Sequence, residues 1–203
     1  MEEPTHLDLL RRGADAWNRW RKEHAEIQPN LRRITLRDVN LRGVNLSRVD
    51  MSIAYFIRID FSTALLREAN IQGTDFHGSD LSGADLSNAN LQGANLTRTN
   101  LSQAKFQGAT LNRAVLSGAN LTQANLRGVP FHAATLIGAN LSGADLQGAD
   151  LTSANLFMAN LSQADLHGAN LRGANLTGCN LDNAQCEHTD LNEAVFASNS
   201  GLG

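Results

Sequence analysis

The chain has 203 residues, a formal net charge of −3 and a hydrophobic content of 42%, but only 5% of its residues are aromatic. With a pI near 6.0, the chain lacks the excess of basic residues that is typical of proteins that bind nucleic acids or membrane surfaces. The acidic start has no apolar run typical of a signal peptide, and no window of the sequence is apolar enough to span a membrane. Two cysteines make no disulfide framework. We therefore expect a cytoplasmic protein.

Residues 5–24 show the pattern of a helix. Thr5 followed by Asp8 is typical of a capping box, and apolar residues recur at helical spacing, although Gly13 lowers the helix propensity by about 1 kcal/mol. Both tryptophans of the chain lie in this segment. We predict a lid on the repeat that follows rather than an aromatic recognition helix, because an uncovered solenoid end is costly. The side chains expected to form this cap are Leu7, Leu10, Trp17 and Trp20.

From Pro29 to Ser198 the chain consists of 34 five-residue units without an insertion or deletion. The third position carries Leu in 25 units and Phe in six, the first is mostly Ala, and the second is mostly Asn or Asp. All 14 glycines of this segment occupy the fifth position. Such strict registration identifies an internal repeat that determines the fold.

A period of five matches neither a helix nor a long strand, but it fits three extended residues followed by a two-residue corner. The first and third side chains then point to one side, the inside. Glycine at the fifth position suits a type II turn, whose second corner residue has a positive φ. Units with Asn88, Gln103 or Ser153 at this position are expected to use another turn type. Four corners close a square coil, and successive coils stack at about 4.8 Å by β-ladder hydrogen bonds.

Units such as ANLQG, ADLQG and ANLRG match the consensus A(D/N)LXX. The chain resembles the pentapeptide-repeat family over about 170 of its 203 residues. The resemblance implies an all-β solenoid, a right-handed quadrilateral β-helix, here of about 8 coils and about 40 Å long. The run AWNRWR is similar to the leader of some cyanobacterial members. The predicted organisation is an N-terminal α-helical cap at 1–28, the β-helix at 29–198 and a short tail at 199–203.

The C-terminal end shows no second helix, because only seven residues follow Phe196. The last coil would expose its core and an open β edge, so we expect Phe196 or another molecule to cover it. Basic residues crowd the first coil and acidic residues the last, which leaves end-to-end association as one alternative. Because the N-terminal helix would block that edge, a tail-to-tail homodimer is the favoured assembly.

No loop interrupts the repeat to carry a catalytic group, so we predict a protein that is not an enzyme and uses no cofactor or metal. His167 and His188 share one side in adjacent coils, but without a third ligand they are expected to be solvated. The nine second-position Asp residues occupy the slot in which Asn and Asp bond the local backbone and stack in ladders. Cys179 and Cys186 occupy inward slots and are predicted to be buried and inert.

Ten large apolar residues interrupt the polar pattern at outward positions, and seven of them belong to the side that carries Leu116, Leu136 and Leu156. Four lie in three successive coils and predict a patch about 10 to 15 Å long. Scattered surface hydrophobes need no explanation, but a contiguous patch on a rod indicates an interface. The candidate interaction face consists of Tyr55, Ile57, Val115, Ile137, Phe157, Met158 and Val195.

These features predict a non-catalytic rigid scaffold for protein–protein interaction with an unidentified protein partner. The family resemblance implies an alternative, a DNA-mimicking inhibitor or protector of a type II topoisomerase such as gyrase. The fourth and fifth positions carry eleven Arg and five acidic residues. When the nine second-position Asp are added, the positive and negative charges on the surface of the rod nearly balance. A DNA mimic should instead be strongly acidic. We expect no membrane partner, and no direct nucleic-acid binding because the arginines form no contiguous stripe.

Overall fold

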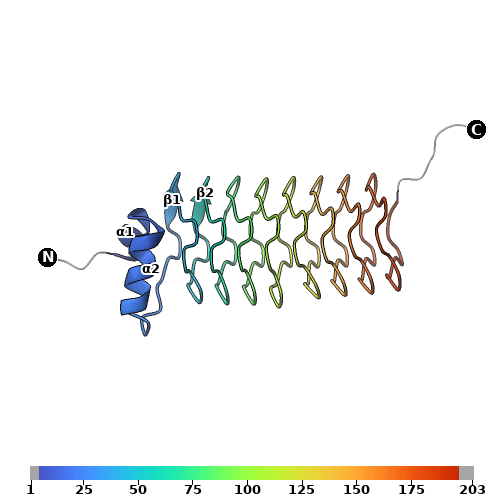
Figure 1. Cartoon of the computed structure of the whole chain (residues 1–203). Coiled ribbons are helices and arrows are strands. Elements are labelled where there is room, and N and C mark those ends of the chain that lie inside the picture. The colour runs from blue at the N-terminus through green and yellow to red at the C-terminus, as the bar shows by residue number, and fades with distance from the viewer. Residues whose placement is uncertain (1–4, 197–203) are drawn as a thin grey trace, which may run out of the picture.

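The computed structural model describes residues 5–196, in which two short helices precede a straight stack of square coils (Figure 1). Helix α1 spans His6–Arg11 and helix α2 spans Ala14–Glu23. Strand β1, Thr35–Arg37, pairs in parallel with strand β2, Tyr55–Ile57. In the other described coils, isolated parallel bridges replace longer strands.

The coils stack in a register of twenty residues. Every bridge joins residues twenty apart, from Asn30 with Asp50 at one end to Asn175 with Val195 at the other. Since four five-residue units make twenty residues, each unit lies over the corresponding unit of the preceding coil. The square coil predicted from the repeat is therefore the observed one.

The prediction of one helix over residues 5–24 is wrong, because the chain breaks at Gly13. This residue has a φ of 94°, which only glycine adopts readily, and it lies between the end of α1 and the first residue of α2. The predicted capping box is present at the start of α1, where the Asp8 N–H donates to Thr5 Oγ1 at 3.2 Å.

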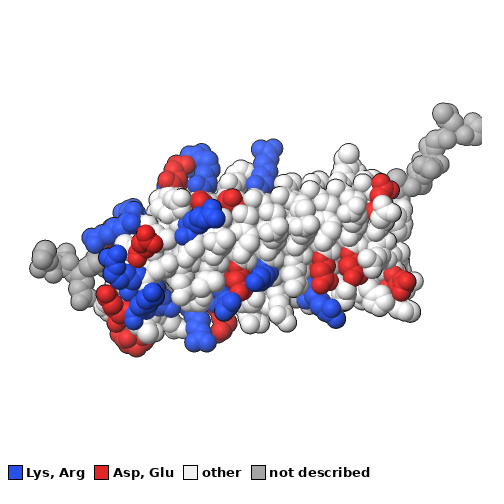
Figure 2. Space-filling model, viewed as in Figure 1, with Lys and Arg blue, Asp and Glu red and all other residues white. Residues whose placement is uncertain are grey.

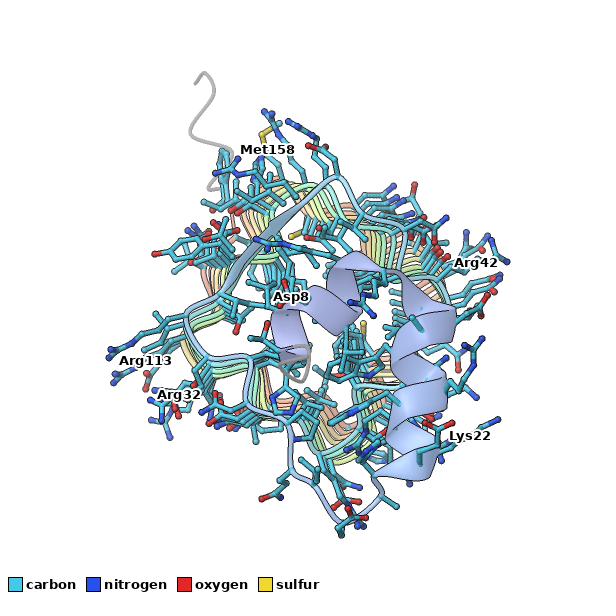
Figure 3. The ribbon with its side chains drawn as sticks, turned by 90° about the vertical axis from the view of Figure 1, so that its left-hand side faces the viewer. Asp8, Lys22, Arg32, Arg42, Arg113 and Met158 are labelled. Atoms are coloured by element: carbon cyan, nitrogen blue, oxygen red, sulfur yellow. The ribbon has the colours of Figure 1, made fainter. Side chains whose placement is uncertain are left out.

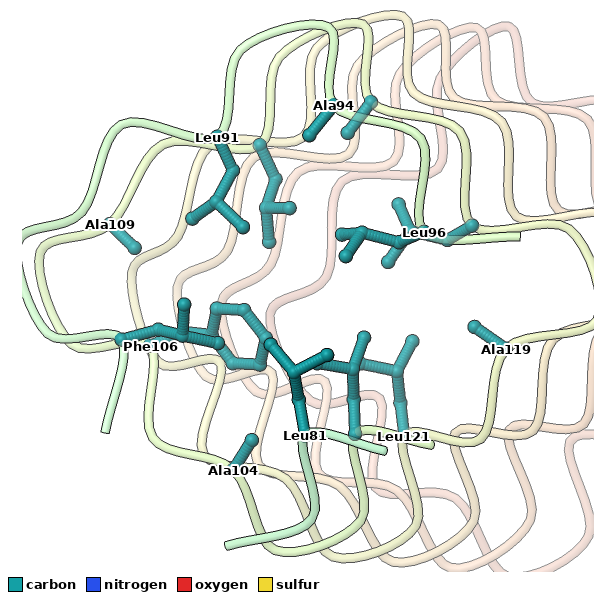
Figure 4. Packing of buried hydrophobic residues seen from close by; sticks show 14 of the residues in the cluster. Leu81, Leu91, Ala94, Leu96, Ala104, Phe106, Ala109, Ala119 and Leu121 are labelled. Atoms are coloured by element: carbon teal, nitrogen blue, oxygen red, sulfur yellow. The ribbon is translucent and has the colours of Figure 1, made fainter. Parts of the chain in front are cut away.

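The first- and third-position side chains fill the interior of the rod. Each third-position side chain from Leu31 to Leu176 is at most 3% exposed. Figure 4 shows this packing near the middle of the rod, where Leu91 points inward above Phe106 and Ala94 supplies a small side chain from the next unit. Burying one leucine contributes roughly 1.5–3 kcal/mol, so the stacked leucines are the main source of stability.

Backbone hydrogen bonds recur in most units below the last described coil, as residues 99–103 illustrate. The third-position N–H of Leu101 donates to Asn120 of the next coil at 2.7 Å, and the fifth-position N–H of Gln103 donates to Thr122 at 2.9 Å. The Ala104 N–H closes the corner by donating to the carbonyl of Leu101 at 3.1 Å. Together with the second-position N–H, which donates to the preceding coil, three N–H groups per unit thus join neighbouring coils while a fourth fixes the corner.

Second-position asparagine and aspartate supply the remaining acceptor. Asn100 Oδ1 accepts the fourth-position N–H of Ser102 at 3.2 Å, and its Nδ2 donates to Asp80 Oδ1 in the preceding coil at 3.1 Å. Where Pro130 takes the place of this residue, the N–H of His132 instead donates to Asn112 Oδ1 of the preceding coil at 2.9 Å. The predicted local bonds and ladders are both present.

The corners all share one backbone conformation. Every fifth-position residue from 33 to 193 has a positive φ, whether it is one of 14 glycines or one of 19 other residues. Asn88, Gln103 and Ser153, with φ values of 59°, 58° and 58°, follow the same pattern, so the expectation of another turn type for them was wrong. The reason is the hydrogen bond that the fifth-position N–H donates to the next coil, because it holds this residue in the same conformation whatever its side chain.

The last described coil is more exposed than the coils beneath it. Leu191 and Phe196 occupy inward slots yet are 39% and 48% exposed. Cys179 is half-buried and Cys186 is exposed, so the prediction that both are buried was wrong. Burial still raises the pKa of both thiols. These side chains are exposed because no described coil lies above them, and the predicted tail at 199–203 lies outside the described residues.

Candidate functional site

The outward surfaces of the rod form four sides, which we name by their third-position residues. Side A runs from Leu31 to Leu191, side B from Leu36 to Phe196, side C from Leu41 to Leu181, and side D from Leu46 to Cys186. Because each side repeats every twenty residues, outward side chains form columns along the rod axis.

Four exposed apolar side chains lie together on side B, and we call them the side B patch. Val115, Ile137 and Phe157 are 37%, 38% and 38% exposed, and Met158 is 62% exposed. Ile137 and Phe157 occupy the same column in adjacent coils, while Met158 is the next corner residue. Figure 3, seen from the N-terminal end, shows Met158 projecting outward at a corner of the square.

Small neighbours make the patch stand out from the rod. Met158 occupies a corner column in which the residues one coil away on either side are Gly138 and Gly178. A Cβ at Gly178 would lie 3.3 Å from Met158 Cγ, whereas a Cβ at Gly138 would meet no atom within 4 Å. The corner therefore offers one projecting side chain beside an open hollow.

The structure does not bring the whole candidate face together. Tyr55 and Ile57 belong to β2, several coils away from the side B patch, and Val195 lies in the last described coil. Tyr55 and Val195 are 47% and 54% exposed, while Ile57 is only half-buried. They are outward on side B as predicted but separate from the patch.

Sides B and C carry no charged residue between 99 and 181, and we call this surface the charge-free strip. It includes the side B patch and, on side C, a flat array of Asn, Ser, Thr, Gln and Gly. The charged residues of the same segment all belong to sides A and D, namely Lys105, Arg113, Arg127, Asp145, Asp150, Asp165 and Arg172.

Charge is concentrated toward the N-terminal end. Figure 2 shows Lys and Arg gathered over the helices and first coils, with mostly uncharged surface and scattered basic and acidic residues beyond them. Burial raises the pKa of Asp85, but hydrogen bonds from Ser87 and Arg67 outweigh it, so its pKa lies below the ordinary value. The Arg67 Nε lies 2.7 Å from Asp85 Oδ2.

The predicted histidine pair does meet, but it forms no recognisable metal centre. The rings of His167 and His188 lie edge to face with centroids 5.3 Å apart, and Glu187 Oε2 is 3.9 Å from His167 Nδ1. Among residues 5–196, no group of three or more metal-binding side chains is arranged to hold an ion.

Helix α2 contacts the first coil through polar side chains. Trp17 Nε1 donates to the Asn45 carbonyl at 2.7 Å, and Asn18 Oδ1 accepts the Asn45 N–H at 2.7 Å. Asn18 Nδ2 donates to the Gly43 carbonyl at 3.0 Å, and Arg21 donates to the Ser47 carbonyl at 3.3 Å. The groups of Asn45 and Ser47 are ones that an earlier coil would otherwise pair.

The apolar residues predicted for this contact are buried to different degrees. Leu10 and Trp17 are completely buried, Leu7 and Trp20 are partly buried, and the neighbouring Leu9 is 5% exposed. Sequence reasoning missed Asn18 and Arg21, although both lie in the run AWNRWR, because helical spacing reports apolar faces and not hydrogen bonds.

Neither helix within residues 5–196 has the length and hydropathy of a membrane span. No curated protein matches the sequence. Among solved structures, a trypsin-treated variant of QnrB1, a plasmid-mediated fluoroquinolone resistance protein, superposes with a TM-score of 0.76 at 22% identity, over 83% of this chain and 89% of QnrB1. Full-length QnrB1 gives a TM-score of 0.75 at 22% identity, over 81% and 84%.

HetL, a pentapeptide-repeat protein involved in heterocyst differentiation regulation from the cyanobacterium Nostoc sp. strain PCC 7120, is 30% identical over 86% of this chain and 94% of HetL, with a TM-score of 0.48. The family described as pentapeptide repeats matches residues 30–67, 54–83, 79–118, 94–131, 131–156 and 159–196. This match and the likeness to QnrB1 imply that the four-sided coil is right-handed. The chain belongs to the pentapeptide-repeat family.

Proposed function

We propose that this protein is a non-catalytic, cytoplasmic scaffold that docks a protein partner on side B. The observation that carries the proposal is the side B patch, four exposed apolar side chains set in a charge-free strip. A contiguous apolar patch on a protein surface is a usual mark of an interface. The partner is therefore expected to present an apolar surface with little charge.

The rod supports this role by holding the patch rigidly. The Ile137 carbonyl accepts a ladder hydrogen bond from the Gly118 N–H at 2.9 Å, and the Phe157 carbonyl accepts one from the Gly138 N–H at 2.9 Å. The Phe157 N–H in turn donates to Asn155 Oδ1 at 3.1 Å. A partner would thus meet a surface that loses little backbone entropy on binding.

We further infer that α1 and α2 act as an N-terminal cap, with the chain divided into a cap at 1–28, a β-helix at 29–198 and a tail at 199–203. The hydrogen bonds of Trp17, Asn18 and Arg21 support this division, because they satisfy carbonyl and N–H groups at the open edge of the first coil.

The alternative is inhibition or protection of a type II topoisomerase. The likeness to QnrB1 favours it, and residues 68–196 carry eleven acidic against five basic residues. Against it, residues 5–67 carry twelve basic and seven acidic residues, so the rod is not uniformly acidic as a duplex mimic should be. A gyrase supercoiling assay tests the alternative. Full gyrase activity without a quinolone, together with undiminished inhibition by a quinolone, at micromolar rod would exclude it.

The double variant Ile137→Glu with Phe157→Glu tests the scaffold proposal. Both side chains point outward, so the fold should be retained, while partner capture from the source organism should be lost. The matched control is Gln72→Glu with Gln92→Glu, which introduces the same two glutamates at the same position of adjacent coils on side A. Equal capture by both double variants would show that side B is not the docking surface.

A further inference from the structure

We propose that the side B patch is occupied by a second copy of this chain, with the two rods side by side and antiparallel. This inference rests on the proposed function, because it names the partner of the same surface. It differs from a tail-to-tail dimer, which would use the last coil. Three features of the described residues support it: charge, shape and the charge polarity of the rod.

The charge-free strip is suited to face itself. In a two-fold contact, residues near the axis meet the same residues of the other copy, so a charged side chain there is repelled by its equivalent. Side D would bring Asp145 and Asp165 close to each other. Sides B and C between 99 and 181 avoid that repulsion, since they carry no charge.

The side B patch also matches its own shape. Ile137 and Phe157 have nearly equal exposure and lie in one column, so a two-fold axis between their coils sets Ile137 of one copy against Phe157 of the other. Ser117 and Thr177, the residues that flank them in this column, are small, and the open corner at Gly138 leaves room beside Met158. Two copies can therefore approach closely.

The charge polarity of the rod sets the orientation. With the axis between the coils of Ile137 and Phe157, an antiparallel partner lies alongside residues 98–196 and leaves the two basic N-terminal parts at opposite ends. The last coil, which carries Asp182, Glu187, Asp190 and Glu193, then lies level with Arg98, Lys105 and Arg113 of the other copy. A parallel pair would instead set basic against basic and acidic against acidic, which is unfavourable.

Sedimentation equilibrium between 1 and 500 micromolar tests the assembly. Because the apolar contact comprises only four side chains per copy, we expect a dimer that dissociates at micromolar concentrations. Ile137→Glu should raise the dissociation constant at least about 100-fold. Gln92→Glu on side A and Leu191→Glu on the last coil should leave it within about two-fold. Ile137→Glu and Gln92→Glu, both at outward positions, should retain the parent melting temperature.

The outcomes separate this inference from the proposed function. A dimer lost with Leu191→Glu and kept with Ile137→Glu would overturn the inference in favour of contact through the last coil. A wild-type monomer at 500 micromolar that still captures a partner through side B would also overturn it, yet leave the scaffold proposal standing. A wild-type protein that stays monomeric and captures no partner through side B would overturn both this inference and the scaffold proposal.

Disulfide trapping tests the orientation in a background with Cys179→Ala and Cys186→Ser. In an antiparallel pair, a mixture of Ile137→Cys and Phe157→Cys chains should cross-link at least about five-fold more than either variant alone. A parallel pair predicts the reverse, because each cysteine would meet its own equivalent. The reverse result would therefore overturn the antiparallel arrangement.

Discussion

At the scale of single residues, the corner shows how the ladder overrides local preference. Ile53 and Thr63 are β-branched residues, which strongly avoid positive φ, yet they have φ values of 59° and 57°. Their N–H groups donate to the next coil at 3.0 Å and 2.8 Å, respectively, like those of glycines at the same position. Hydrogen bonding between coils thus holds strained residues in a conformation that their side chains disfavour.

Substitutions at Gly93 and Ile53 should change the free energy of unfolding in opposite directions if this strain is real. Gly93→Ala should lower the free energy of unfolding by about 1 kcal/mol, because a Cβ there would meet open space and only backbone strain acts. Ile53→Gly should raise it by up to about 1 kcal/mol, since relief of strain exceeds the entropy cost of glycine. Denaturant titration measures both, and effects of the same sign would contradict this account.

At the scale of elements, the N-terminal helices bond backbone groups of the first coil through their side chains. Trp17 and Asn18 together pair both the N–H and the carbonyl of Asn45, a second-position residue whose N–H would otherwise bond a preceding coil. Glycine at position 13 makes this possible by turning the chain between α1 and α2. The helices are thereby matched to one edge of the coil.

Trp17→Phe tests this match by removing the indole N–H. The variant leaves the part-buried carbonyl of Asn45 without its donor and removes part of a buried ring, which together should cost about 1–3 kcal/mol of stability. Trp20→Phe is the control, because Trp20 is only partly buried and stacks on His24. Thermal melts compare the two, and equal losses would mean that the hydrogen bond is unimportant.

Sequence reasoning reached the elements that repeat and missed those that do not. The five-residue period predicts the coil, its register and the outward positions of Ile137 and Phe157, because each unit solves the same packing problem. It could not predict the roles of Asn18 and Arg21, which depend on the orientation of α2. It also assigned burial to Cys186 from its slot alone, although burial requires a coil above it.

At the scale of the whole molecule, stability should vary along the rod because each coil contacts only its neighbours. In the described residues, the third-position N–H of Leu101 donates to the next coil, whereas those of Leu181 and Leu191 find no backbone acceptor. Hydrogen exchange should therefore be at least about 100-fold faster at Leu181 and Leu191 than at Leu101, as measured by NMR. Uniform protection would show that another part of the chain or a second copy covers the last coil.

The uninterrupted run of 34 units has a consequence for how this chain can change by insertion and deletion. Removing one unit between Val115 and Ile137 would leave a foldable rod but turn everything beyond it by a quarter of a revolution. Val115 and Phe157 would then lie on different sides of the rod, and the charge-free strip would be divided into two parts on different sides. Removing a full set of four units would instead shorten the rod and preserve every alignment. If side B is the working surface, tolerated length changes should come in multiples of twenty residues.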